Sequence, residues 1–188
     1  IIIFFKQVLK KFVTQKIIIS IDCMGGDNAP EANIKGISIF LSSVSNVYFS
    51  LYGDEKKLLP IIKKYSNLQG NYDIFHTDEF IKPCEKPSVA LKKGKNSSMR
   101  LAIDSIKSKT SDAMISSGNT GALMTISKIV LRSLPAVDRP AIVTYIPNQK
   151  NKGTVLLDMG ANVNCSSEIL YQFAVMGYAF AKVVLNKQ

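Results

Sequence analysis

The sequence has no tryptophan, one histidine and only three cysteines among its 188 residues. The cysteines (Cys23, Cys84 and Cys165) are odd in number and form no Cys-x-x-Cys pair, which argues against a disulfide framework or a structural zinc site. No apolar run approaches the length of a membrane span. We therefore expect a globular, cytoplasmic protein with no metal site and no cofactor.

Acidic residues are also scarce, with 14 of them against 24 lysines and arginines, for a net charge of +10. Such a chain suits an anionic small substrate, an acidic protein partner or nucleic acid, and charge does not choose among them. The aromatic and basic residues show no interleaved stacking pattern, so we expect no nucleic-acid partner.

The first residues form an amphipathic pattern. Between residues 1 and 13, apolar side chains share one helical face and lysines share the other, and no acidic residue is present. One interpretation is a basic helix that touches a membrane surface. The other, which we favour, is that residues 1–15 are an extension outside the fold and that the domain comprises residues 16–188, with no internal linker.

Apolar, β-branched runs alternate with helical patterns along the rest of the chain. The predicted strands are Ile17–Ile21, Val47–Tyr52, Tyr72–His76, Ala113–Ser116, Ala141–Ile146 and Thr154–Leu157. The predicted helices are Glu31–Leu41, Glu55–Tyr65 (with Pro60 as a kink or a late start), Ser97–Ser108, Thr120–Arg132 and Ser167–Leu185. This order predicts an α/β protein, a three-layer α/β/α sandwich with a mostly parallel, Rossmann-like sheet.

Three glycine-bearing turns follow predicted strands. They are Met24–Asn28, Ser116–Gly121 and Asp158–Asn162. A strand, a glycine turn and a helix start in succession direct main-chain N–H groups at an anion, and the carboxyl ends of parallel strands form the ligand crevice. Neither the Walker A pattern nor Gly-x-Gly-x-x-Gly is present, so the sequence predicts a phosphate site rather than a nucleotide site.

Other polar residues fall on the same predicted rim. His76 suits a general base by type, although a structural role is equally expected for a lone histidine. Lys95 and Arg100 bring positive charge to a helix start, where the helix dipole does not explain it, whereas Lys92 and Lys93 fit a solvated loop. Asp27 fits a helix cap, the role of Asp22 is open, and Cys23 fits packing better than nucleophilic attack.

The last predicted helix is almost free of charge. No charged residue occurs between Ile169 and Ala181. A helix that is apolar all round is normally buried on all sides. We therefore expect a partner subunit, or sequence beyond Gln188, to cover it.

Several of these stretches together resemble the PlsX family of phosphate acyltransferases from bacterial phospholipid synthesis. The matching stretches are Ile21–Glu31, Gly53–Glu55, His76–Glu79, Lys95–Ala102, Ser116–Met124, Arg139–Ala141, Lys152–Val163 and Gln172–Gly177, in order from about residue 16 to 185. Residues 1–15 are extra, the region of Gly94 differs from the family's usual lysine-rich loop, and the chain resembles only the N-terminal part of the family.

The resemblance implies an enzyme in which inorganic phosphate attacks the thioester of acyl-[acyl carrier protein], releasing acyl phosphate and the free carrier protein. It also implies a fold related to phosphotransacetylases and to isocitrate and isopropylmalate dehydrogenases, a homodimer, and a cytoplasmic location with peripheral membrane contact. Two alternatives stay open: an acyltransferase that uses coenzyme A thioesters, and an inactive truncated relic.

Within this scheme each candidate site residue has an expected role. The expected catalytic residues are Asp22, His76, Lys95 and Asn119. The expected phosphate- or substrate-binding residues are Gly25, Gly26, Asp27, Asn28, Ser97, Ser98, Arg100, Ser117, Gly118, Thr120, Gly121, Asp158, Gly160 and Asn162. The N–H groups of Ser117–Gly121 would hold the phosphate, and those of Gly25–Asn28 would stabilise the oxyanion that forms on the thioester carbonyl.

Overall fold

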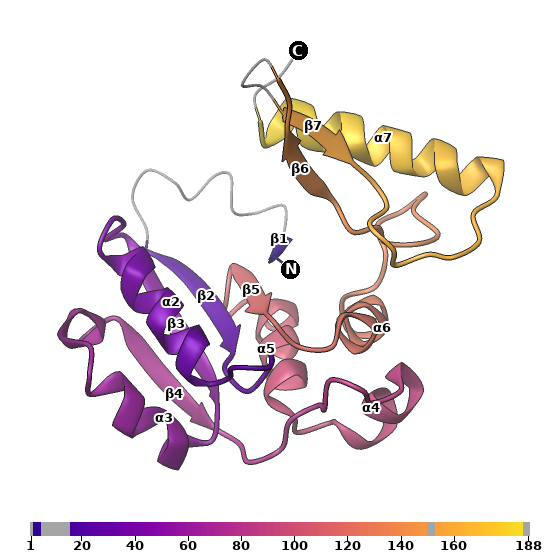
Figure 1. Ribbon diagram of the computed structural model, residues 1–188. Coiled ribbons are helices and arrows are strands. Elements are labelled where there is room, and N and C mark those ends of the chain that lie inside the picture. Colours follow the sequence, from indigo (N-terminus) through magenta and orange to yellow (C-terminus); the bar gives the residue numbers. More distant parts are fainter. Residues whose placement is uncertain (1, 5–15, 150–152, 186–188) are drawn as a thin grey trace. The chain divides into compact units, whose positions relative to one another are not determined.

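The computed structural model describes residues 2–4, 16–149 and 153–185, which fall into two compact units, Ile1–Leu131 and Arg132–Gln188 (Figure 1). No linker in the sequence marks this boundary. Helix α6 (Thr120–Leu131) ends at the boundary, and Pro135 and Pro140 follow it without a longer polar or glycine-rich segment.

The first unit is built on a five-stranded sheet. Its strands are β1 (Ile2–Phe4), β2 (Ile17–Asp22), β3 (Val47–Gly53), β4 (Tyr72–His76) and β5 (Ala113–Ser116), in the spatial order β1-β5-β2-β3-β4. Strands β5, β2, β3 and β4 are parallel, and β1 pairs antiparallel with β5 at the edge. The predicted α/β class with a mostly parallel sheet is confirmed.

Helices cover both faces of this sheet (Figure 1). They are α2 (Glu31–Leu41), α3 (Glu55–Ile62), the 3-10 turn η1 (Ser66–Leu68), α4 (Pro87–Lys93), α5 (Ser98–Lys107) and α6 (Thr120–Leu131). Helices α2 and α3 pack on one face, in a cluster that includes Ile21 and Leu51. Helices α5 and α6 pack on the other, in a cluster that includes Met114.

The alternation of side chains along β2 decides where its polar residues lie. Ile17, Ile19 and Ile21 join the cluster under α2 and α3. The intervening Ser20 therefore faces α5, where its hydroxyl donates to the carbonyl oxygens of Ala102 and Ala113 at 3.1 and 3.2 Å. Asp22, two residues further on, faces the same way.

Two local predictions for this unit need correction. Residues 87–93, for which no helix was predicted and of which Lys92 and Lys93 were expected in a loop, form α4, because Pro87 at its first position fits a helix start and Ala90 is fully buried. Lys92 and Lys93 thus lie in the last turn of a helix. Pro60 lies inside α3, which begins at Glu55 as predicted but ends at Ile62, three residues earlier than predicted.

The amphipathic helix considered for residues 1–13 is wrong for residues 2–4, which form β1. Their main chain pairs with Ala113–Ile115, so the edge of the sheet selects an extended conformation over the helical pattern. Residues 5–15 lie outside the described residues, and their assignment to an extension stays a prediction.

The second unit consists of strands β6 (Thr144–Pro147) and β7 (Gly153–Leu156) and helix α7 (Ser167–Val183). The two strands pair antiparallel, which corrects the expectation that they continue a parallel sheet. Helix α7 packs on β7 and the residue after it at Gly177, where an added Cβ would lie 4.0 Å from Val155 and 3.0 Å from Leu157. Of the residues of α7, Phe173 is buried whereas Tyr171 and Tyr178 are 71% and 65% exposed. The described residues thus leave much of the helix uncovered, and what covers it stays a prediction.

Among the described residues, none of the helices combines the length and the apolar character that a membrane crossing requires.

Candidate anion-binding site

The candidate site lies where the chain direction reverses across the sheet. From β2 the chain moves outward to β3 and β4, and it then returns to the other side of β2 as β5. In parallel sheets the crevice at such a switch point is where ligands bind. Asp22 and Ser116 are paired in register there, as the last residues of β2 and β5.

Asp22 is the centre of a hydrogen-bond network. Its side chain is 2% exposed. The Ser98 hydroxyl, at the start of α5, donates to its Oδ1 at 2.6 Å, and the Ser116 hydroxyl donates to its Oδ2 at 2.7 Å. One carboxylate therefore joins the end of β2, the end of β5 and the start of α5, although these residues are 76 and 94 positions from it in sequence.

Burial raises the pKa of the Asp22 carboxyl above its ordinary value of 3.8, because the charged form loses its hydration. Hydrogen bonds from Ser98, Ser116 and the N–H groups of Met24 and Gly25 act in the opposite direction, since they favour the carboxylate. Next to it, burial and then the charge of Asp22 raise the pKa of the fully buried Cys23 thiol well above its ordinary value. Cys23 is thus a packing residue, as expected, and not a thiolate nucleophile.

Two of the three glycine-bearing turns are in contact. A Cβ on Gly118 would lie 3.2 Å from Cα of Gly25, and a Cβ on Gly25 would lie 2.4 Å from Oδ2 of Asp22 and 3.0 Å from the nitrogen of Gly118. No side chain fits at either position, so the two turns approach through bare main chain. Asn33 of α2 holds the first turn in place, because its amide donates to the carbonyl oxygens of Cys23 and Gly25 at 2.9 and 3.0 Å.

The first turn itself leaves part of its main chain available. The N–H of Gly25 points to the Asp22 carbonyl at 3.4 Å, and the N–H of Ala29 to that of Gly26 at 3.3 Å. Asp27 and Asn28 are exposed. The N-cap residue of α2 is Pro30, which makes no side-chain capping bond within the described part of the chain, so the capping role considered for Asp27 is wrong.

The second turn leads into α6 with its first N–H groups uncovered. Asn119 caps the helix: its Oδ1 accepts from the N–H of Ala122 at 3.0 Å. Within the described part of the chain, no acceptor bonds the main-chain N–H of Ser117, Asn119, Thr120 or Gly121. Thr120 and Gly121 are exposed, so this helix start combines free donors with the positive end of the helix dipole.

Asn119 also holds the segment before α4, a structural role that was not predicted from the sequence. Its amide nitrogen donates to the carbonyl oxygens of Lys82, Pro83 and Glu85 at 3.3, 2.9 and 2.8 Å. Both ends of this side chain are therefore engaged in holding α6 and the segment before α4. A catalytic role for Asn119 stays a prediction.

At the start of α5, the four predicted residues lie in four different environments. Ser97 caps the helix, accepting from the N–H of Arg100 at 3.3 Å, and Ser98 is directed to Asp22. The Arg100 guanidinium forms an ion pair along its own helix, with Nε 3.1 and 3.0 Å from the two oxygens of Asp104. Lys95 is exposed in the turn that precedes the helix.

His76 is the last residue of β4. It lies at the carboxyl ends of the parallel strands, as Asp22 does, but two strands away from β2. Its Nδ1 accepts from the N–H of Glu55 at 3.2 Å, which places it at the start of α3 beside the capping residue Asp54. This bond gives His76 a structural task, and its catalytic role stays a prediction.

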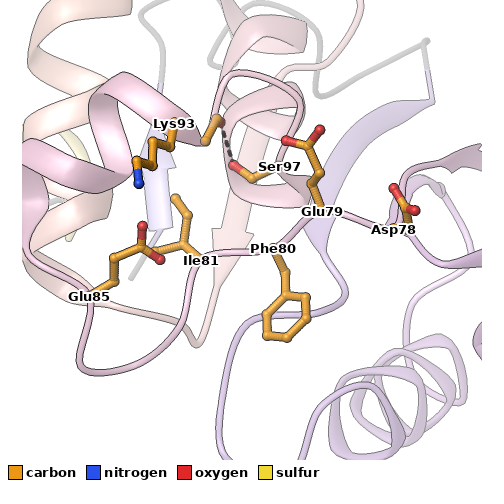
Figure 2. A pocket seen from close by; sticks show the side chains of 8 residues that line it. Asp78, Glu79, Phe80, Ile81, Glu85, Lys93 and Ser97 are labelled. Atoms are coloured by element: carbon orange, nitrogen blue, oxygen red, sulfur yellow. Dashed lines mark hydrogen bonds between the residues drawn. The ribbon is translucent and has the colours of Figure 1, made fainter.

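The segment after His76 is tied to the turn that carries Lys95. Thr77 donates to the carbonyl oxygen of Asn96 at 2.6 Å, and the carbonyl oxygen of Glu79 accepts from the N–H of Ser98 at 3.0 Å. A cavity of about 250 Å³ opens between these segments (Figure 2). Its lining residues are Asp78, Glu79, Phe80, Ile81, Glu85, Lys93, Gly94 and Ser97. Because its lining carries three carboxylates and a single lysine, this cavity does not suit a phosphate.

The third glycine-bearing turn belongs to the second unit, and its predicted binding residues bond to one another. Asp158 accepts from the N–H of Ile142 at 2.7 Å and from the N–H of Asn162 at 2.6 Å. The Asn162 amide also donates to the Pro140 carbonyl at 3.0 Å, and Gly160 adopts a positive φ of 86°. These contacts shape the turn, and phosphate binding by its residues stays a prediction.

Two residues of the network were missed in the sequence. The turn that starts at Ser116 was recognised but its first side chain was not, and Asn33 was not considered. The pairing of Ser116 with Asp22 follows from the alternation of β2 only once β5 is known to be its neighbour. Asn33 gave no signal beyond its place in the first turns of a helix.

Comparison with known proteins relates this arrangement to a family. The sequence model of the family described as "Fatty acid synthesis protein" matches residues 17–188. A protein of Ehrlichia ruminantium named "Phosphate acyltransferase" is 50% identical over 171 residues, which cover 89% of this chain and 50% of that protein. Proteins of the same name from Ehrlichia chaffeensis and Rhodospirillum centenum are 49% and 42% identical, covering 89% and 93% of this chain and 51% and 49% of their own lengths. The chain spans about half the length of the curated relatives that it matches, and it belongs to the fatty acid synthesis protein family, the PlsX family that its motifs resemble.

Proposed function

We propose that the whole protein transfers an acyl group from acyl-[acyl carrier protein] to inorganic phosphate, and that this chain supplies the phosphate-binding turns. The observation that carries the proposal is the network around Asp22. It joins the two contacting glycine turns at the switch point of the sheet, next to the uncovered N–H groups that open α6. The names of the relatives support the reaction class.

In this scheme the N–H groups of Asn119, Thr120 and Gly121 bind the phosphate oxygens. Their partial positive charge favours a dianion, and their direction is fixed before the substrate arrives. Lys95, which is exposed in the turn before α5, adds a mobile positive charge. The cavity of Figure 2 has no part in phosphate binding in this scheme, because its acidic lining repels a phosphate dianion.

The chemical step needs no covalent enzyme intermediate. A phosphate oxygen attacks the thioester carbonyl carbon, the new carbon–oxygen bond forms, and the carbon–sulfur bond breaks to release the thiolate of the carrier protein. The N–H groups of Gly26, Asp27 and Asn28 stabilise the transient oxyanion; removal of one such donor typically costs about 3 kcal/mol. A thiolate leaves readily, so the step requires no strong acid.

The partner assignment is supported by charge. With a net charge of +10, the chain attracts an acidic carrier protein by long-range steering, whereas a small coenzyme A thioester gains less from a protein-sized surface. A homodimer at the inner face of the membrane, with no nucleic-acid partner, belongs to the same proposal.

The test measures acyl phosphate formed by the whole protein from inorganic phosphate and a long-chain acyl thioester, with the acyl group carried either by carrier protein or by coenzyme A. We expect a clear preference for the carrier-protein donor. We also expect Lys95→Ala to lower kcat/KM for phosphate about tenfold while Lys107→Ala, in the last turn of α5, leaves it unchanged. If neither donor yields acyl phosphate, the proposal is refuted. If the coenzyme A thioester is preferred, the reaction class stands and the carrier protein is not the acyl donor.

A further inference from the structure

We propose that Ser116 is a positioning residue, which links the Asp22 carboxylate to the main chain of Gly118 and so sets the direction of the N–H groups that open α6. The inference rests on the proposed function, since those N–H groups are the ones that bind phosphate. Ser116 itself is buried, so the role proposed for it is to position the turn and not to bind the substrate.

The geometry forms a short chain of two hydrogen bonds. The Ser116 hydroxyl donates to Oδ2 of Asp22 at 2.7 Å, and the Oγ of Ser116 accepts from the N–H of Gly118 at 3.0 Å. A hydroxyl has one proton to donate. Because that proton goes to the carboxylate, the lone pairs of the Ser116 Oγ accept the N–H of Gly118. Both hydrogen bonds therefore have a fixed direction, from Gly118 to Ser116 and from Ser116 to Asp22.

The carboxylate strengthens the second bond through the first. A hydroxyl that donates to a charged acceptor becomes more electron-rich and is a better acceptor itself. Ser98 donates to the other oxygen of Asp22 at 2.6 Å and keeps the carboxylate from rotating. The buried charge of Asp22 thus acts on the turn at Gly118 without touching it.

The turn transmits this constraint to the helix start. Gly118 leaves no space for adjustment, because an added Cβ would lie 3.2 Å from both the Ser116 Oγ and the Gly25 Cα. Asn119 follows directly as the cap of α6, and Thr120 and Gly121 carry the next two N–H groups. The orientation of the peptide between Ser117 and Gly118 therefore decides where the following N–H groups point.

The experiment compares Ser116→Ala with Ser20→Ala in the whole protein. Ser20 is a matched control, since its buried hydroxyl lies on the same face of the neighbouring strand β2 and, among the residues that the structure describes, bonds only to the carbonyl oxygens of Ala102 and Ala113. Ser116→Thr retains the hydroxyl and serves as the rescue variant. Should Ser116→Ala not fold, Ser116→Cys replaces it, because sulfur keeps the volume but is a poor acceptor.

Two readouts are measured. The first is the KM for inorganic phosphate, the KM for the acyl thioester and kcat. The second, which needs no activity, is hydrogen exchange of the Gly118 amide by NMR. We expect Ser116→Ala to raise the KM for phosphate about tenfold, to leave the KM for the thioester within about twofold, and to speed Gly118 exchange about tenfold, as loss of one buried hydrogen bond implies. Ser20→Ala should do none of these.

The outcomes separate the two proposals. Equal loss of phosphate affinity in Ser116→Ala and Ser20→Ala, or failure of Ser116→Thr to restore it, overturns the positioning role. If the unaltered protein forms no acyl phosphate, the proposed function fails, and the exchange measurement then decides alone. Faster exchange at Gly118 in Ser116→Ala than in Ser20→Ala upholds the link, and equal exchange refutes it.

Discussion

Replacement of Gly25 by alanine should break the network at its tightest point. The added Cβ would lie 2.4 Å from Oδ2 of Asp22 and 3.0 Å from the nitrogen of Gly118. Neither neighbour can give way, because Ser98 and Ser116 hold the carboxylate from both sides and Gly118 is main chain. Overpacking costs roughly 1–3 kcal/mol and a displaced buried hydrogen bond about the same, so we expect a loss of about 3 kcal/mol in the free energy of unfolding.

The matched control is Gly36→Ala. Gly36 lies exposed in α2, and an added Cβ there meets nothing within 4 Å. Alanine in a helix is more stable than glycine, so this variant should gain about 0.5–1 kcal/mol. Urea unfolding followed by far-ultraviolet circular dichroism measures both. A Gly25→Ala variant within about 1 kcal/mol of the unaltered protein would contradict the reasoning, since overpacking alone costs at least that much.

Two further predictions concern the pH dependence and the helix cap. Because the pKa of Asp22 is higher in the folded than in the unfolded protein, its contribution to stability is present below pH 3.8 and is lost as pH rises through the raised pKa. The stability advantage of the unaltered protein over Asp22→Asn should therefore shrink as pH rises from 3.8 toward neutrality in urea titrations, and a constant or growing advantage would be inconsistent with burial as the main cause. Asn119→Ala should lose about 2 kcal/mol in the same assay, since it removes the cap of α6 and three bonds to residues 82–85, whereas the exposed Thr120→Ala should change stability by less than about 0.5 kcal/mol. Equal effects of these two substitutions would argue against the capping role.

Much of the first unit was predictable because its periodic signals are strong. The bounds of α2, β4 and β5 match the prediction residue for residue, since α2 follows Pro30 directly and polar or glycine residues follow all three elements. Helix α4 was not predicted, because seven residues with two lysines give too short a pattern to distinguish from a loop. Strand β6 begins at Thr144 rather than Ala141, and periodicity could not reveal that it pairs antiparallel with β7.

The site was predictable in its turns but not in its connections. The glycine turns after β2 and β5 carry a local signature, and the alternation of β2 places Asp22 opposite Ile21. That Ser98 and Ser116 both reach Asp22 depends on which helix and which strand lie beside β2, and this is set by packing over separations of 76 and 94 residues. The occupied side chains of Asn119, Arg100 and Asp158 were likewise invisible in the sequence.

The central claim is that main-chain N–H groups at the start of α6 bind inorganic phosphate. The most direct measurement is an NMR titration of the isotope-labelled whole protein with phosphate, with chloride added at equal ionic strength as the reference. The account predicts saturable shifts of the Asn119, Thr120 and Gly121 amide signals that chloride does not reproduce. Shifts confined to other amides, or identical responses to phosphate and chloride, would contradict it.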